Sequence, residues 1–251
     1  MTLNRAVTFT WCSSPLEQFE VYRIPVFFNN VALFAALALV VTALIFLSSS
    51  VYGHFLPRNP WSSLTAIFQQ QLMVLVARNI GAAGQVYFPF LFTLFIFLLM
   101  SNLLGMVPYT FTTTSHIVVT LFLSFTFFIG TNLAGVLRLK LHYFGLFLPS
   151  NSPVLISPFL LLVELISYFA RVASLAIRLF ANMMAGHSLL KILIGFVYAI
   201  FLSDVVGLIW GWLPFLLVFL ITFLEVGVAF VQAYVFTTLL CIYIRDLYHA
   251  H

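Results

Sequence analysis

The sequence predicts an all-α integral membrane protein, because it carries very little charge and has several apolar runs long enough to cross a bilayer. Of its 251 residues, 63% are hydrophobic and only 6% are charged, whereas a soluble domain is about one quarter charged. So few charges cannot cover the surface of a globule in water. We expect one membrane domain over residues 1–251, with three ordinary transmembrane helices, one membrane-surface amphipathic helix, and two long, steeply tilted helices that form a hairpin.

The first transmembrane helix is expected at residues 31–47, after an N-terminal segment of residues 1–30. The stretch VALFAALALVVTALIFL contains no charge, and about 20 apolar residues make one transmembrane helix. Glu17 and Glu20 do not fit an organelle transit sequence. This run is therefore interpreted as a permanent span.

Residues 61–80 predict an amphipathic helix that lies on the membrane surface. Apolar side chains recur there at steps of three and four, at Trp61, Leu64, Phe68, Leu72 and Leu75. Serine, threonine and glutamine fill the other faces, which is typical of a helix with one apolar stripe. An ordinary additional span is the alternative for this segment.

Residues 85–137 are expected to form a helical hairpin. Its first helix covers residues 85–107 and is interrupted only by Pro89, and its second helix covers residues 116–137. The turn between them, PYTFTTTS at residues 108–115, begins with proline and is rich in threonine.

Residues 153–247 contain two long runs with almost no signals for a turn. The run 153–200 has no proline after Pro158, and the run 203–247 has only Pro214. A helix of this length would measure roughly 65 Å, whereas the hydrocarbon core is only about 30 Å thick. Each run is either a hairpin of two short spans or one strongly tilted helix. The candidate turn residues lie in no polar cluster, which favours two single tilted helices; they are Asn182, Gly186 and Gly227.

The first long run carries a polar stripe. Glu164, Arg171 and Arg178 follow one another at intervals of seven residues. Seven residues make nearly two whole helical turns, so these side chains share one face. Asn182 lies four residues further on and joins the same face.

The second long run carries Glu225 and Gln232, again seven residues apart. Stripes of this kind can hold two helices together, but that role does not explain an arginine. Arginine keeps its proton in proteins, whereas glutamate and histidine can bind and release one. Arg178 among these groups therefore suggests a proton route that contains an electrostatic barrier. His187 is nine residues after Arg178 and points to the opposite face of a straight helix, where it is expected to line a separate aqueous cavity with Asp204.

No cofactor, metal or nucleic-acid partner is expected. Cys12 and Cys241 are far apart and lack metal-site spacing, so both are interpreted as unpaired thiols. No glycine-rich phosphate loop follows a strand pattern.

Three motifs resemble subunit a of the F-type ATP synthase: SLAIRLFANMMAGHSLL at 174–190, FLEVGVAFVQAYVFTTLLCIYI at 223–244, and SNLLGMVPY at 101–109. The resemblance covers nearly the whole chain. It implies a proton-translocating stator subunit that couples proton flow to ring rotation and ATP synthesis, with no nucleotide site of its own. The implied partners are the ring of c subunits, the peripheral-stalk and other membrane subunits, protons and the lipid bilayer. The implied location is the mitochondrial inner membrane, with the plasma membrane of an alphaproteobacterium as the alternative.

The resemblance also implies roles for the polar residues. Arg178 matches the essential arginine that faces the c-ring carboxylate and separates two aqueous half-channels. Asn182 and Gln232 match polar partners near that arginine. Glu225 and His187 match a proton-relaying pair in the half-channel open to the intermembrane or periplasmic side, with the two residue types exchanged relative to many bacterial members.

The remaining matches are less complete. Glu164 matches a carboxylate of the other half-channel, and Asp204 is a further candidate for the proton pathway. Arg171 and Asn102 receive no firm role. Two other functions stay open at this point, a haem- or quinone-carrying subunit of a respiratory chain and a purely structural membrane subunit.

Overall fold

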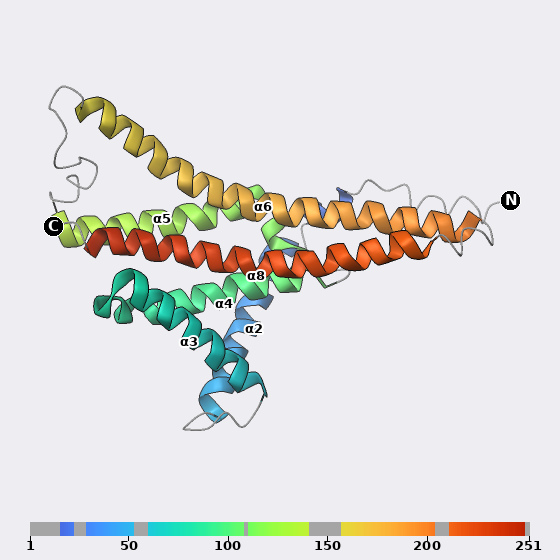
Figure 1. Ribbon diagram of the computed structural model, residues 1–251, viewed down its shortest axis with the longest axis horizontal. Coiled ribbons are helices and arrows are strands. Elements are labelled where there is room, and N and C mark those ends of the chain that lie inside the picture. The colour runs from blue at the N-terminus through green and yellow to red at the C-terminus, as the bar shows by residue number, and fades with distance from the viewer. Residues whose placement is uncertain are drawn as a thin grey trace.

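The computed structural model describes six stretches of the chain: residues 16–22, 29–52, 60–107, 110–140, 157–203 and 211–248. They form six α-helices and three short 3-10 helices, and no strand occurs among them (Figure 1). Five of the α-helices are long and apolar enough to cross a membrane. These observations confirm the predicted fold class.

In Figure 1, α2 lies across the direction of the longest helices, and α3 runs obliquely to them. Helix α2 spans Asn30–Tyr52 and extends beyond the predicted span at both ends. Helix α3 spans Pro60–Ile80 and is not among the five helices apolar enough to span a bilayer. Leu72 and Val76 of α3 are buried against the rest of the protein, whereas Ile67 is exposed. The outer side of α3 also carries exposed apolar residues, among them Met73 and Val74, so the placement of this helix on the membrane surface stays a prediction.

Helices α4 and α5 occupy the segment expected to form a hairpin, but α4 packs mainly against α8 and α5 mainly against α6. Helix α4 spans Phe88–Gly105 and follows a 3-10 helix, η2, at Ala82–Tyr87. Pro89 lies in the first turn of α4, where a helix needs no backbone donor. The proline therefore marks the start of this helix and does not interrupt it. Helix α5 spans Ile117–Leu139, after the short 3-10 helix η3 at Thr113–Ser115.

The last two helices are each continuous. Helix α6 spans Ser157–Ser203, 47 residues, and α8 spans Trp212–Tyr248, 37 residues. Pro158 and Pro214 fall in their first turns, where proline is tolerated. The prediction of single long helices is confirmed, and the alternative of two short spans per run is wrong.

Helices α6 and α8 run side by side in opposite directions (Figure 1). At 1.5 Å per residue α6 is about 70 Å long, more than twice the hydrocarbon thickness of about 30 Å. It fits such a layer only if it is steeply tilted or if its ends project. Helix α2 runs across the α6–α8 pair, as expected if α2 spans the membrane and the pair is steeply tilted in it.

The main apolar core surrounds α8, which packs against α3, α4 and α6. Phe236 of α8 lies at its centre with only 2% of its surface exposed. Its ring meets the ring of Phe127 of α5 edge to face, with centroids 5.8 Å apart. This core fixes the rotation of α8, and hence the direction in which its polar residues point.

A smaller aromatic cluster joins α5, α6 and α8. The rings of Phe128 and Tyr168 lie 4.9 Å apart, and Tyr168 and Tyr243 lie 5.2 Å apart. The Tyr168 hydroxyl donates a hydrogen bond of 3.1 Å to the Asn132 amide oxygen. The guanidinium of Arg171 lies 5.7 Å from the centre of the Tyr243 ring, within reach of a cation–π attraction.

Replacing Phe236 with alanine should destabilise the helix packing by about 3–5 kcal/mol, because it removes a fully buried ring and leaves a cavity. The thermal unfolding temperature of the purified, detergent-solubilised protein measures this loss. Phe122 of α5 is 74% exposed, so Phe122→Ala is the matched control and should change it little. Equal unfolding temperatures for the two variants would contradict the packing described here.

Candidate functional site

Polar residues of α6 and α8 meet at two separate places. At the first, Arg178 and Asn182 of α6 and Gln232 of α8 line a cavity of about 680 Å³, whose other walls are apolar side chains of α8. Gln232 is 2% exposed, and its Nε2 has no hydrogen-bond partner among the residues that the structure describes. The spacing predicted that Arg178 and Asn182 share a face, and both reach the same cavity.

A second cavity, of about 360 Å³, begins on the other side of Arg178. Its polar lining comes from Arg171 and Ser174 of α6 and from Tyr234 and Thr238 of α8. Because the two helices are antiparallel, the first cavity runs from Arg178 toward the end of α6, and the second runs toward its beginning. Arg178 is the polar residue that borders both cavities.

Arg178 lies on an exposed face that is mostly apolar. Neighbouring side chains on this face include Ile177 of α6, and Phe223 and Leu224 of α8, all at least half exposed. Within the described part of the chain the guanidinium forms no ion pair. A permanent charge set in an apolar surface needs a partner to compensate it.

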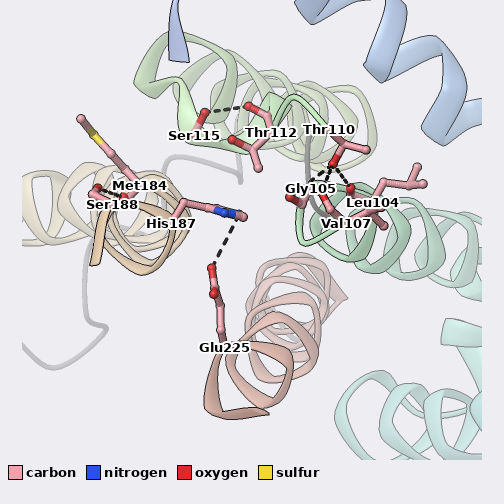
Figure 2. Close-up of polar contacts among 10 residues, drawn as sticks. All are labelled: Leu104, Gly105, Val107, Thr110, Thr112, Ser115, Met184, His187, Ser188 and Glu225. Atoms are coloured by element: carbon pink, nitrogen blue, oxygen red, sulfur yellow. Dashed lines mark hydrogen bonds and ion pairs between the residues drawn. The ribbon is translucent and has the colours of Figure 1, made fainter. Parts of the chain in front are cut away.

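The second meeting place lies between His187 of α6 and Glu225 of α8. His187 Nε2 lies 3.6 Å from Glu225 Oε1, and the two side chains point toward each other in Figure 2. This distance is longer than a hydrogen bond. Neither this nitrogen nor either carboxyl oxygen of Glu225 has a hydrogen-bond partner among the described residues. Glu225 is 5% exposed, so a small movement or one bridging water would connect the pair.

Gly186 allows this pair to form. A Cβ atom added to Gly186 would lie 2.6 Å from Glu225 Oε1 and 2.9 Å from its carboxyl carbon, closer than atoms can approach. The carboxyl group of Glu225 therefore rests against the backbone of α6, beside His187. The sequence marked Gly186 only as a possible turn residue, because nothing in it shows that Glu225 packs against this position.

Residues 110–116, which connect α4 to α5, also lie near His187 (Figure 2). Figure 2 shows the imidazole extending from α6 toward the segment that carries Thr112 and Ser115, while Glu225 approaches from α8. Within that segment the His116 ring stacks on Phe111 with centroids 5.2 Å apart. Partial burial lowers the pKa of His116 below its ordinary value of 6.5.

Not all the predicted site residues come together. Glu164 is exposed on α6, 14 residues before Arg178 and therefore about 21 Å from it along the helix axis, and it lines neither cavity. Arg171, which had no firm role, lines the second cavity. Asp204 lies outside the residues that the structure describes.

Comparison with known proteins identifies the family. Residues 31–245 match the family described as "ATP synthase A chain". The chain belongs to this family. The ATP synthase subunit a of Marchantia polymorpha is 44% identical over 249 residues, which cover 95% of this chain and 99% of that protein. The ATP synthase subunit a of Pelagibacter ubique (strain HTCC1062) is 38% identical over 95% of this chain and 99% of that protein.

The family confirms the resemblance seen in the sequence. Its members are membrane subunits of the H⁺-transporting ATP synthase and hold no catalytic site of their own. The haem- or quinone-carrying alternative is therefore wrong. The relatives include organellar and alphaproteobacterial proteins, which fits a multi-pass protein of the mitochondrial inner membrane and also one of a bacterial plasma membrane.

Gly186→Ala should lower the rate of ATP synthesis by the assembled enzyme about tenfold or more, because the added methyl group displaces the Glu225 carboxyl group from His187. The rate is measured in vesicles under an imposed proton gradient. Gly195→Ala is the matched control on the same helix, since a Cβ atom there meets nothing within 4 Å. Equal rates for the two variants would show that the position of Glu225 has no effect on synthesis.

Proposed function

We propose that this chain is the proton-translocating stator subunit of an F-type ATP synthase. In this proposal two aqueous half-channels approach Arg178 from opposite directions, and the exposed face of α6 and α8 lies against a ring of c subunits. The peripheral stalk and the other membrane subunits hold the chain still while the ring turns. The observation that carries the proposal is that Arg178 borders both cavities.

A permanent cation at this position prevents a proton leak. If the two cavities held water without a barrier between them, protons could pass from one to the other without moving the rotor. Arginine cannot give up its proton in a protein. A proton arriving in either cavity meets a fixed positive charge and has to leave on another carrier.

A carboxylate of the c ring would be that carrier. An opposite charge within a few ångströms stabilises an ionised carboxylate by roughly 1.4–4 kcal/mol, so a ring carboxylate loses its proton as it approaches Arg178. One proton crossing 100 mV releases about 2.3 kcal/mol. The two energies are similar, so the attraction is strong enough to bias ionisation and weak enough for rotation to release the site.

Glu225 and His187 would relay protons toward this carrier. Both side chains can bind and release a proton, and they lie 3.6 Å apart on the part of the α6–α8 pair that flanks the first cavity. Gln232 follows Glu225 by two helical turns on α8 and reaches the Arg178 cavity. In this proposal Glu225 passes protons from the intermembrane or periplasmic side toward the ring, while Asn182 and Gln232 hold the guanidinium in place. Glu164 would line the opposite half-channel, as its resemblance implies.

Replacing Arg178 with alanine should lower coupled ATP synthesis about a hundredfold or more and increase passive proton leak, because the barrier between the cavities is gone. Arg178→Lys should also fail, since lysine is a localised charge that can lose its proton when buried. Both are measured in vesicles that contain the assembled enzyme. Arg245→Ala, at an exposed arginine near the end of α8, is the control.

Native gels separate this proposal from a purely structural role for Arg178. The proposal expects a fully assembled enzyme that no longer couples proton flow to synthesis. Loss of assembly in Arg178→Ala, with normal coupling in whatever enzyme remains, would support the structural role. Normal coupled synthesis in a fully assembled variant would overturn the proposal.

Replacing Glu225 with glutamine should slow proton-driven ATP synthesis by about tenfold to a hundredfold, because glutamine has nearly the same shape but cannot carry a proton. The amount of assembled enzyme should not change. Glu225→Asp keeps a carboxyl group and should recover part of the rate. An unchanged rate in Glu225→Gln would remove this residue from the proton path.

A further inference from the structure

The first cavity beside Arg178 is larger than its proposed role requires. Its volume of about 680 Å³ is typical of a small-molecule site, since such sites measure about 300–1,000 Å³. A ring carboxylate on a short acidic side chain would fill only the part next to the guanidinium, because the backbone of its helix stays outside. The cavity therefore has room for a further ligand.

The polar lining of this cavity includes hydrogen-bond donors that lack an acceptor. Arg178 forms no ion pair within the described part of the chain. Gln232 is 2% exposed, and its Nε2 has no hydrogen-bond partner among the described residues. Buried donors normally have partners, and guanidinium and amide N–H groups both bind carboxylate oxygens. A carboxylate is thus the ligand group that these donors fit.

The apolar wall of the cavity suits a hydrocarbon chain. It consists of side chains of α8 and opens on the surface of the α6–α8 pair, because four of its residues are at least 60% exposed: Leu220, Phe223, Leu224 and Val231. A hydrocarbon chain can move from lipid to this wall without entering water, since both surroundings are apolar. The ligand that combines the two parts of the lining is an amphiphilic carboxylate.

Gly227 leaves open space in the same wall. The sequence marked it as a candidate turn residue, but it lies inside the continuous helix α8. A Cβ atom added to Gly227 would meet nothing within 4 Å. A larger side chain at this position would therefore occupy the cavity without a clash inside the chain.

The second cavity does not fit such a ligand. It measures about 360 Å³, and hydroxyl groups of Ser174, Tyr234 and Thr238 contribute to its lining. Hydroxyl groups bind water well but give a hydrocarbon chain no apolar surface. The amphiphilic ligand is thus assigned to the first cavity.

The position of Arg178 decides which kind of amphiphile can reach it. Arg178 lies near the middle of α6, which spans Ser157–Ser203. The phosphate of a membrane lipid stays ionised and remains at the membrane surface, because a charge in hydrocarbon is expensive. A carboxylic acid can enter in its neutral form and ionise beside the guanidinium, since a nearby opposite charge favours the ionised form. Its proton then passes to water in the cavity.

We infer that the first cavity binds a long-chain free fatty acid, with its carboxylate on Arg178 and its hydrocarbon chain along α8 past Gly227, and that the bound acid inhibits the enzyme. The inhibition rests on the proposed function. A bound carboxylate already neutralises Arg178, and the hydrocarbon chain displaces water from the half-channel. An arriving ring carboxylate then finds neither the free cation nor the water that it needs.

The first test detects binding without relying on activity. Palmitic acid that carries a photoreactive diazirine in its chain is added to the assembled enzyme in vesicles, and the labelled peptides are located by mass spectrometry after illumination. Labelling should concentrate on residues 220–235 of α8. It should fall about tenfold in Arg178→Ala, which lacks the charged partner.

The methyl ester of the same probe is the matched control for this test. The ester has the same chain but no charge, so it should label residues 220–235 about tenfold less than the acid. Equal labelling by the acid and the ester would overturn the inference. Labelling of α5 around the exposed Phe122 as strongly as α8 would also overturn it, because it shows general contact with lipid only.

The second test measures ATP hydrolysis by the assembled enzyme in vesicles. An ionophore keeps the proton gradient at zero, so proton conduction by the fatty acid itself cannot change the rate. Palmitate should inhibit hydrolysis, whereas methyl palmitate should not. Gly227→Leu fills space in the cavity and should raise the palmitate concentration for half-inhibition about fivefold or more, with each variant compared with its own rate without palmitate.

Gly195→Leu is the matched control for Gly227→Leu. A Cβ atom at Gly195 also meets nothing within 4 Å, and Gly195 lines neither cavity, so this variant should be inhibited like the unaltered enzyme. Equal half-inhibition in the two leucine variants would overturn the inference. If Gly227→Leu does not assemble on native gels, the smaller change Gly227→Ala takes its place, and the comparison of acid and ester labelling decides the matter in the unaltered enzyme.

Failure of this inference is distinguishable from failure of the proposed function. If Arg178→Ala loses coupling, while the acid and the ester label alike and Gly227→Leu is inhibited like Gly195→Leu, the fatty-acid site is wrong and the proposed function stands. If Arg178→Ala couples normally, the proposed function fails, and inhibition by competition with the ring fails with it.

Discussion

The arrangement of this protein depends on one electrostatic constraint, a guanidinium that stays positively charged in an apolar surface. The cost of such a charge is high unless an opposite charge or a polar surrounding compensates it. Arg178 finds Asn182 and Gln232 beside it, and both are polar but neutral. The attraction of the arginine is thus left for an anion that approaches from outside the chain, which is what a turning ring of carboxylates would supply.

The remaining helices can be understood as the support for this position. The core around Phe236 fixes the rotation of α8, and the cluster around Tyr168 and Tyr243 fastens α5 to α6 and α8. At Gly186 of α6, the Glu225 carboxyl group of α8 occupies the place of the missing side chain. The His187–Glu225 pair and Arg178 therefore sit on the same two helices, and the spacing along α6 between His187 and Arg178 is set by helix geometry.

Much of this organisation follows from sequence periodicity, because a seven-residue spacing fixes a shared helix face before any tertiary contact is known. The continuity of α6 and α8 was also predictable, since neither run contains a polar turn cluster. Three features were not predictable. Pro89 resembles a break in an apolar run, and only the preceding 3-10 helix shows that it starts α4. Gly186 lies against Glu225 of another helix, and Gly105 lies against Thr112 across a turn, and neither close approach can be read from the sequence. The buried threonines between α4 and α5 resemble an ordinary solvated turn until their burial is known.

Because α6 is one unbroken helix, a residue inserted or deleted within it moves every residue that follows. Arg178 and His187 lie on one continuous helix, so a single residue inserted between them would rotate everything that follows by about 100° and advance it by about 1.5 Å. His187 would then turn away from Glu225, and Gly186 would no longer lie beneath the carboxyl group. A side chain can be exchanged at many points of this helix with local effect, whereas an insertion or deletion between the two residues would put every later contact out of register.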